Sequence, residues 1–459
     1  MRKSIRWPAA AFALTVVVAA ALPAWADHET RPRTRNMHAK GHSPHPATFF
    51  GEPDGVRHIS SDLAFWGRLA FQGNYDGWRV IDISDPDDPV ELAHPSCNGD
   101  QGDLVVWENV LVRSWNSKKA VDRLCLDEIV PAGWEGVHVF DISDPLDPDL
   151  VASVELPCGS HTATAAGVDD GDLIVYSNIS SSAGCTGGDP AGDFMDVIAV
   201  PLDDPSAASL IHREPLEGPA TAVATGCHDV GVILGDVNKA ACASADTINV
   251  WDIADPRDPA LLFTIQEPGV GQAGTGGRWH SAAFTWDGEV IVAGWEPGGG
   301  AAPECETTDP DVKKSAFFYD ADTGAKLGQW VLPRGQDADP VTGAPQNCTI
   351  HNYNVVPLRS GRYVLVSGNY QAGTWVTDFT DPANPVTVGW SDPPALPPIS
   401  AGPPPVFELG GAWSSYWYNN FIYESDITTG LNAFRLSDAA TGGAIRLDHL
   451  NPQTQEFTL

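Results

Sequence analysis

Positive charge is scarce in this 459-residue chain, in which 26 Lys and Arg stand against 60 Asp and Glu for a formal net charge of -34. An acidic surface of this kind repels phosphate backbones and anionic lipid. We therefore expect no nucleic-acid partner. Most of the charge is explained by solubility, and cation binding is the alternative explanation.

The common catalytic motifs are also missing. The chain has no G-x-S-x-G elbow, H-E-x-x-H pair, P-loop or dinucleotide-binding fingerprint, which argues against serine hydrolysis, zincin chemistry and nucleotide chemistry. No two cysteines have the C-x-x-C spacing of a zinc knuckle or redox site. Helical periodicity is scarce, and 45 Gly with 38 Pro suit a chain of strands and turns.

Long apolar runs are confined to the start of the chain. Residues 1–26 combine the basic "MRKSIR", an Ala-rich apolar stretch and the small-x-small triplet ending at Ala26, which predicts a signal peptide. No other segment approaches the roughly 18 apolar residues of a membrane span. We expect a secreted protein without a transmembrane span in its mature form.

One phrase recurs four times. "VIDISDPDDP" begins at Val80, and close copies begin at Val139, Val250 and Val376. The β-branched and aromatic residues of the phrase suit a strand, and Asp-Pro followed by a second Pro must end that strand. A second apolar run then follows, so each phrase predicts two strands around a rigid corner. We expect its Asp to cap the turn rather than to bind a ligand.

Degenerate copies fill the intervals between these four. Aligned on Asp82, the seven equivalent positions are Asp82, Asp141, Pro201, Asp252, Asp320, Asp378 and Arg435. Each copy also has an upstream strand-turn-strand half, so that one copy accounts for a four-stranded antiparallel blade. The sequence therefore predicts an all-β fold, a seven-bladed β-propeller over residues 51–459 with residues 27–50 as an N-terminal arm. Either a segment around His45–Phe50 or the C-terminal end could close the ring.

The "VIDISDP" phrase resembles the LVIVD repeat of β-propeller proteins on bacterial and archaeal surfaces. The whole mature chain, including "NYQAGTWVTDFTDP" and "GGAWSSYWYNNFIYE", is similar to an exported actinobacterial group with that repeat. The resemblance implies the propeller fold and brings no established reaction with it.

Histidine is the most informative functional signal. Five of the 13 histidines stand 10–12 residues before the residue that opens the second strand of their blades: His58, His161, His228, His280 and His351. Each one thus marks the start of an innermost strand, and equivalent ends of these strands meet at one mouth of a propeller. The other two blades offer Gly99 and Gly410 near that register.

Two interpretations of these histidines remain open. They either bond neighbouring blades together as buried structural residues, or converge on a transition metal or small ligand. Carotenoid cleavage oxygenases and the selenium-binding protein group hold channel histidines in similar propellers, but their sequence motifs are missing here. Copper or zinc suits an exported, disulfide-bonded protein better than ferrous iron. Asp229 and Asp100 are acid–base candidates near the ring.

The eight cysteines fall around the same register. Four precede innermost strands or lie close to them, and four follow, which favours sequential pairing: Cys97–Cys125, Cys158–Cys185, Cys227–Cys242 and Cys305–Cys348. Such bonds would brace the loops at the histidine-bearing mouth.

The alternative function is non-enzymatic recognition of a glycan or protein through aromatic loops. Trp413–Tyr423 and Gly294–Gly300 place aromatic residues near loops, where exposed rings bind partners, although packing between blades explains them as well. The polar arm carries His38, His42 and His45 and is expected to act as a strap. We expect a monomer.

Overall fold

The computed structural model describes residues 28–45, 58–99, 101–116, 118–156, 158–179, 194–218, 226–244, 247–270, 278–297, 300, 303–337, 345–393 and 410–459. The predicted signal peptide lies outside these residues. Within them, no helix is long and apolar enough to cross a membrane.

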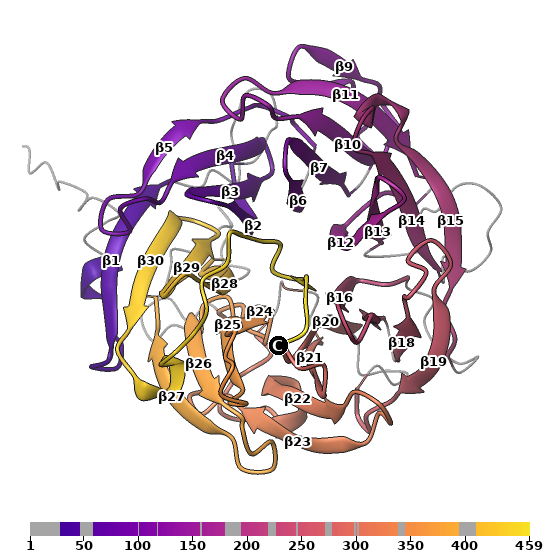
Figure 1. The fold of residues 1–459 in the computed structure, drawn as a ribbon. Coiled ribbons are helices and arrows are strands. Elements are labelled where there is room, and N and C mark those ends of the chain that lie inside the picture. The colour runs from indigo at the N-terminus through magenta and orange to yellow at the C-terminus, as the bar shows by residue number, and fades with distance from the viewer. Residues whose placement is uncertain are drawn as a thin grey trace, which may run out of the picture.

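Antiparallel sheets surround a central axis as β-propeller blades, and five of them are separate (Figure 1). The first contains β2 (Ser60–Trp66), β3 (Leu69–Asn74), β4 (Gly77–Asp82) and β5 (Val90–Ala93), with β31 (His449–Leu450) added. The second contains β6 (Leu104–Trp107), β7 (Val110–Trp115), β10 (Gly136–Asp141) and β11 (Asp149–Glu155). The third contains β12 (Thr162–Asp169), β13 (Asp172–Asn178), β14 (Phe194–Pro201) and β15 (Ser209–Pro215).

The remaining sheets complete the ring. The fourth contains β16 (Asp229–Ile233), β17 (Lys239–Ala243), β18 (Ile248–Asp252) and β19 (Ala260–Ile265), with β32 (Thr454–Gln455) added. The fifth contains β20 (Arg278–Phe284), β21 (Val290–Glu296), β22 (Ser315–Asp320) and β23 (Lys326–Val331). An eight-stranded sheet runs β1-β30-β29-β28-β24-β25-β26-β27. Its strands are β1 (Met37–Pro44), β24 (Asn352–Val355), β25 (Val364–Gly368), β26 (Thr374–Asp378), β27 (Val386–Ser391), β28 (Ala412–Tyr418), β29 (Phe421–Asp426) and β30 (Gly430–Leu436).

Minor elements decorate this ring. They are the hairpin of β8 (Arg123–Cys125) and β9 (Glu128–Val130) and the short 3-10 helices η1 (Pro205–Ala207), η2 (Asp311–Lys314) and η3 (Ala439–Thr441).

The innermost strands pack against one another around the axis. β2 contacts β6, and the contacts continue through β12, β16, β20, β24 and β28 back to β2. These strands are buried along almost their whole length, whereas the outer strands β5 and β19 expose most of their side chains. The apolar faces of successive blades therefore form the core, and the channel is lined by the innermost strands.

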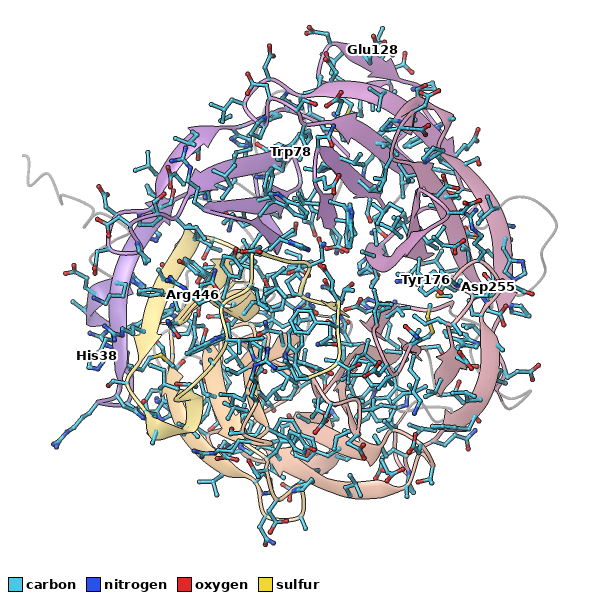
Figure 2. The ribbon with its side chains drawn as sticks, viewed as in Figure 1. His38, Trp78, Glu128, Tyr176, Asp255 and Arg446 are labelled. Carbon is cyan, nitrogen blue, oxygen red and sulfur yellow. A yellow bond between two sulfur atoms is a disulfide. The ribbon has the colours of Figure 1, made fainter. Side chains whose placement is uncertain are left out.

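The recurring phrase forms the outer corners of the blades. The Asp82 carboxylate accepts a hydrogen bond from Ser84 N at 2.8 Å, and Asp141 accepts the equivalent bond from Ser143 N at 2.8 Å. Figure 2 shows Asp255, which belongs to the third full copy, at the rim of the ring. The prediction that these carboxylates cap turns is confirmed.

The N-terminal segment supplies an outer strand. β1 pairs antiparallel with β30 at the edge of the eight-stranded sheet. Arg31, from the segment before β1, forms a buried ion pair with Glu424 at 2.6 Å. Within the described part of the predicted arm, residues 37–44 thus belong to the sheet. The expected closing strand near His45–Phe50 lies earlier in the chain, and residues 46–50 are outside the described part.

The C-terminal tail crosses the channel, and Figure 1 shows its end inside the ring. β31 pairs with the end of β2, and β32 pairs with β16 in parallel. Asn451 exchanges two hydrogen bonds with the backbone of Val106 in β6, both at 2.9 Å. Thr454 Oγ1 donates to the Ala165 carbonyl oxygen in β12 at 2.7 Å. The tail therefore joins several blades across one side of the channel.

Three of the four predicted disulfides are confirmed: Cys97–Cys125, Cys227–Cys242 and Cys305–Cys348. The predicted Cys158–Cys185 pair is not tested, because residue 185 lies outside the described residues.

Candidate metal centre

Four of the five predicted histidines lie side by side at one mouth of the channel. His161, His228 and His351 directly precede the innermost strands β12, β16 and β24, and His280 lies near the start of β20. Their ring centroids follow one another at 4.4 Å from His161 to His228, 4.1 Å from His228 to His280, and 4.1 Å from His280 to His351. The register therefore brings imidazoles of neighbouring blades into contact.

The C-terminal tail lies toward the other end of the channel. Its β32 strand pairs at Val232, which is four residues beyond His228 in β16. At about 3.3 Å per residue, the tail lies roughly 13 Å along the strand from the imidazole.

Hydrogen bonds fix which ring nitrogen of these histidines carries the proton. His228 Nδ1 faces the carbonyl oxygen of His280 at 3.1 Å, and His351 Nδ1 faces the carbonyl oxygen of Trp413 at 2.5 Å. A carbonyl oxygen only accepts, so both Nδ1 atoms must be protonated in the neutral ring. Nε2 is then left with its lone pair. An imidazole held through Nδ1 in this way is the usual arrangement of a metal ligand.

The remaining two histidines follow the same pattern. His161 Nδ1 faces Asn116 Oδ1 at 3.0 Å, and His280 Nδ1 faces the Ser281 hydroxyl at 2.6 Å. The Ser281 hydroxyl itself donates to the His351 carbonyl oxygen and so accepts from His280. All four Nδ1 atoms thus have an acceptor.

Burial keeps these imidazoles neutral. It lowers the pKa of His351 to about 3, and burial together with the Arg278 charge lowers that of His161 to about 3. The pKa values of His228 and His280 lie well below their ordinary value, first because of burial and then because each has other histidines beside it. Neutral imidazole is the form that binds transition metals, so no proton has to leave these rings first.

A carboxylate completes the site. Glu296, at the end of β21, is opposite Arg278 in the β20–β21 hairpin and is only 3% exposed. Burial raises its pKa to about 7, although the Arg278 charge and the hydrogen bond from Tyr370 act in the opposite direction. The Tyr370 hydroxyl donates to Glu296 Oε1 at 3.0 Å, and its ring lies 4.2 Å from that of His351.

The backbone of Tyr370 has a positive φ of 51°. A bulky residue in this region is uncommon and is held there by its surroundings, as often happens at functional sites.

The donor atoms lie close enough for one ion. His228, His280 and Glu296 each offer an atom within 4.8 Å of the others. His280 Nε2 is 3.8 Å from Glu296 Oε2, and His351 Nε2 is 3.9 Å from Glu296 Oε1. Two ligands about 2.1 Å from a tetrahedral metal are about 3.4 Å apart, so small side-chain shifts would suffice. Two imidazoles with one carboxylate form a donor set of catalytic zinc and of non-haem iron.

Glu296 and Tyr370 were not predicted from the sequence. The signal for Glu296 was present, because the antiparallel β20–β21 hairpin containing His280 must return the chain to the same mouth. Tyr370 follows β25 in a turn that no repeat position specifies.

The fifth histidine does not join this group. His58 precedes β2, but its Nδ1 bonds to Asp76 Oδ2 at 2.5 Å in the first blade. Asp229 is buried and accepts a hydrogen bond from Val230 N at 2.9 Å. Burial and the neighbouring acids Asp103 and Asp62 raise the pKa of Asp229 well above its ordinary value. Asp100 lies outside the described residues.

The aromatic segments named for recognition are built into strands. Tyr416, Trp417 and Tyr423 in β28 and β29 are at most 2% exposed, and Trp295 in β21 is 2% exposed. Among the described residues, no Trp or Tyr side chain is classed as exposed. These burials favour packing within and between blades. Trp413 is half-buried, and its ring lies 5.1 Å from that of His351.

No known family model matches the chain, and no curated protein matches it significantly. Among solved structures, the WD40 β-propeller domain of Doa1 is similar, with 12% sequence identity and a TM-score of 0.44. The match covers 87% of this chain and 99% of that one.

Proposed function

We propose that this protein is an exported, seven-bladed LVIVD-type propeller that binds one transition-metal ion at its histidine-bearing mouth. Seven blades follow when the eight-stranded sheet is divided between β24 and β28. β24 to β27 then form the sixth blade, and β28 to β30 with β1 form the seventh. The two halves meet where innermost strands of neighbouring blades touch.

The observation that carries the metal proposal is the convergence of His228, His280 and Glu296 with their donor atoms within 4.8 Å. The Nδ1 bonds support it further, because they leave the Nε2 lone pairs of the imidazoles available to the ion. Zinc is our first choice, since two His and one Glu hold catalytic zinc and leave a fourth position for water or a small ligand. His161 and His351 flank the site as additional imidazoles.

Each residue around the ion has a separate role in this proposal. Glu296 must lose its proton to bind the metal, and the Tyr370 hydroxyl orients its carboxylate. Arg278, in β20, places positive charge beside the site and would attract an anionic group on a bound small molecule.

The test is the metal content of the exported protein, purified without a His tag or chelator and loaded with zinc. We expect one zinc per chain at this site, lost in His228→Asn and in Glu296→Gln. His138→Asn is the matched control, because His138 is equally buried (1% exposed) but packs against Trp134 in the second blade. Circular dichroism shows whether each variant is folded.

An unchanged zinc content in folded Glu296→Gln and His228→Asn would overturn the proposal. The histidines would then serve to hold neighbouring blades together.

A further inference from the structure

A second group of metal-type side chains lies at the first blade, separate from the proposed centre. We define the blade 1 cluster as His45, His58, Asp76 and His94. His45 follows β1, His58 precedes β2, Asp76 lies in the β3–β4 turn, and His94 follows β5. The cluster therefore joins the N-terminal segment to both the inner and the outer edge of the blade.

The donor atoms converge on the Asp76 carboxylate. His45, His58 and Asp76 each offer an atom within 4.8 Å of the others. His58 Nδ1 is 2.5 Å from Asp76 Oδ2, and His94 Nε2 is 3.5 Å from the same oxygen. The rings of His45 and His94 meet edge to face, with centroids 5.3 Å apart. Three imidazoles thus surround one carboxylate.

The carboxylate has an unused oxygen. Asp76 is only 7% exposed, and within the described residues its buried Oδ1 has no hydrogen-bond partner. A buried carboxylate oxygen without a partner costs free energy, which a bound cation would recover.

The surrounding charges permit a cation. The positive charge that acts on His45 is that of Arg79. The Arg79 guanidinium is itself occupied, since its Nε bonds to Glu91 at 2.5 Å and its Nη1 to Gln72 at 2.6 Å. The His45 Nδ1 atom lies 3.2 Å from the Ser60 hydroxyl, which leaves Nε2 as the ligand atom.

We propose that the blade 1 cluster is a second zinc site, with His45, His58 and His94 as nitrogen ligands and Asp76 as the oxygen ligand. Three imidazoles and a carboxylate suit zinc, and the His58 and His94 side chains are 34% and 27% exposed, so the ion can enter from solvent. The ion would fasten the segment after β1 to the first blade. It shares no residue with the site at His228.

The test measures zinc per chain by elemental analysis after dialysis against micromolar free zinc, together with affinity by titration calorimetry. The starting protein carries Glu296→Gln, which empties the first site. We expect this protein to keep one zinc, and Asp76→Asn or His94→Gln added to it to weaken that binding at least tenfold. His38→Gln is the control, because His38 lies on the outer strand β1, where its ring bonds to Ser437 and not to the cluster.

Two outcomes would overturn this second site: no zinc bound by Glu296→Gln, or the same zinc bound with equal affinity when Asp76→Asn is added. Failure of the first site gives a different pattern. In that case wild-type protein and Glu296→Gln both bind one ion, and Asp76→Asn alone binds none. His58→Gln serves as a further variant should Asp76→Asn not fold.

Discussion

The metal affinity of the mouth site should depend on pH through a single proton, carried by Glu296. Burial raises the pKa of this carboxyl from 4.5 to about 7, whereas the imidazoles beside it have lowered pKa values and are already neutral at pH 5.5. The proton on Glu296 must leave before the carboxylate can bind the ion. Affinity should therefore rise with pH up to about 7 and become flat above it.

The size of the effect follows from that pKa. Between pH 7.5 and pH 5.5, the ionised fraction of an acid with pKa 7 falls by a factor of about 25. Zinc should thus bind about 25-fold more weakly at pH 5.5 than at pH 7.5. The slope of log affinity against pH should approach one, which corresponds to one proton released on binding. An unshifted glutamate would change the affinity by only about 10% over this range. Two ordinary histidines would add roughly tenfold each and raise the slope towards three protons per pH unit.

The assay is competition with a chelator of known pH dependence, from pH 5.5 to 8.5, in the Asp76→Asn protein so that only the mouth site is measured. Glu296→Gln should bind weakly with little dependence on pH. A slope of two protons or more in the Asp76→Asn protein that retains Glu296 would refute the claim that burial keeps the imidazoles neutral. An affinity independent of pH would refute the role of Glu296.

Three further predictions concern stability. Replacing Arg31 by Met leaves Glu424 buried without its cation, which should cost about 3–5 kcal/mol of unfolding free energy, measured by urea denaturation. A loss under about 1 kcal/mol would contradict a buried ion pair. Changing Cys305 and Cys348 together to Ser opens a cross-link that spans 43 residues, and loop entropy predicts a loss of about 4 kcal/mol of unfolding free energy. A urea-denaturation midpoint that does not move would show that the bond is not formed. Deleting residues 449–459 removes the strand pairs with β2 and β16, so thermal unfolding should begin at lower temperature, and an unchanged melting temperature would show that the tail contributes nothing.

The closure of the ring illustrates what sequence reasoning could reach. The seventh repeat ends at "NAFRLSD" without the second apolar run that follows the Asp-Pro corner in the other full copies. A strand was therefore missing from that blade, and the chain had to supply it from a distant segment. The choice of Met37–Pro44 could not be predicted, because "MHAKGHSP" has neither strong β propensity nor a repeat position. Pairing with β30 and the Arg31–Glu424 contact place it there.

The histidine group also separates what the sequence can predict from what it cannot. A repeat position occurs once per blade, and rotation about the axis brings equivalent positions to one mouth, so the meeting of His161, His228, His280 and His351 followed from spacing alone. His58 has the same spacing, but one residue separates it from β2, and its ring contacts Asp76, which also lies close to His94, in the first blade. Contacts that differ from blade to blade are invisible to a periodic pattern.

Glu296, the acid that distinguishes a metal centre from a set of structural histidines, is likewise a feature that the repeat does not specify. Glu296 lies at the mouth end of β21, opposite Arg278, and Tyr370 reaches it from a turn with a positive φ in the next blade. A purely structural role for the imidazoles would not require a buried carboxyl beside them, since each Nδ1 already has an acceptor. A buried acid that is half-ionised near pH 7 is costly, and the charge of Arg278 offsets only part of that cost, because the pKa of Glu296 stays above its ordinary value. The departure of the fifth blade from the repeat is therefore a stronger argument for function than the repeat itself.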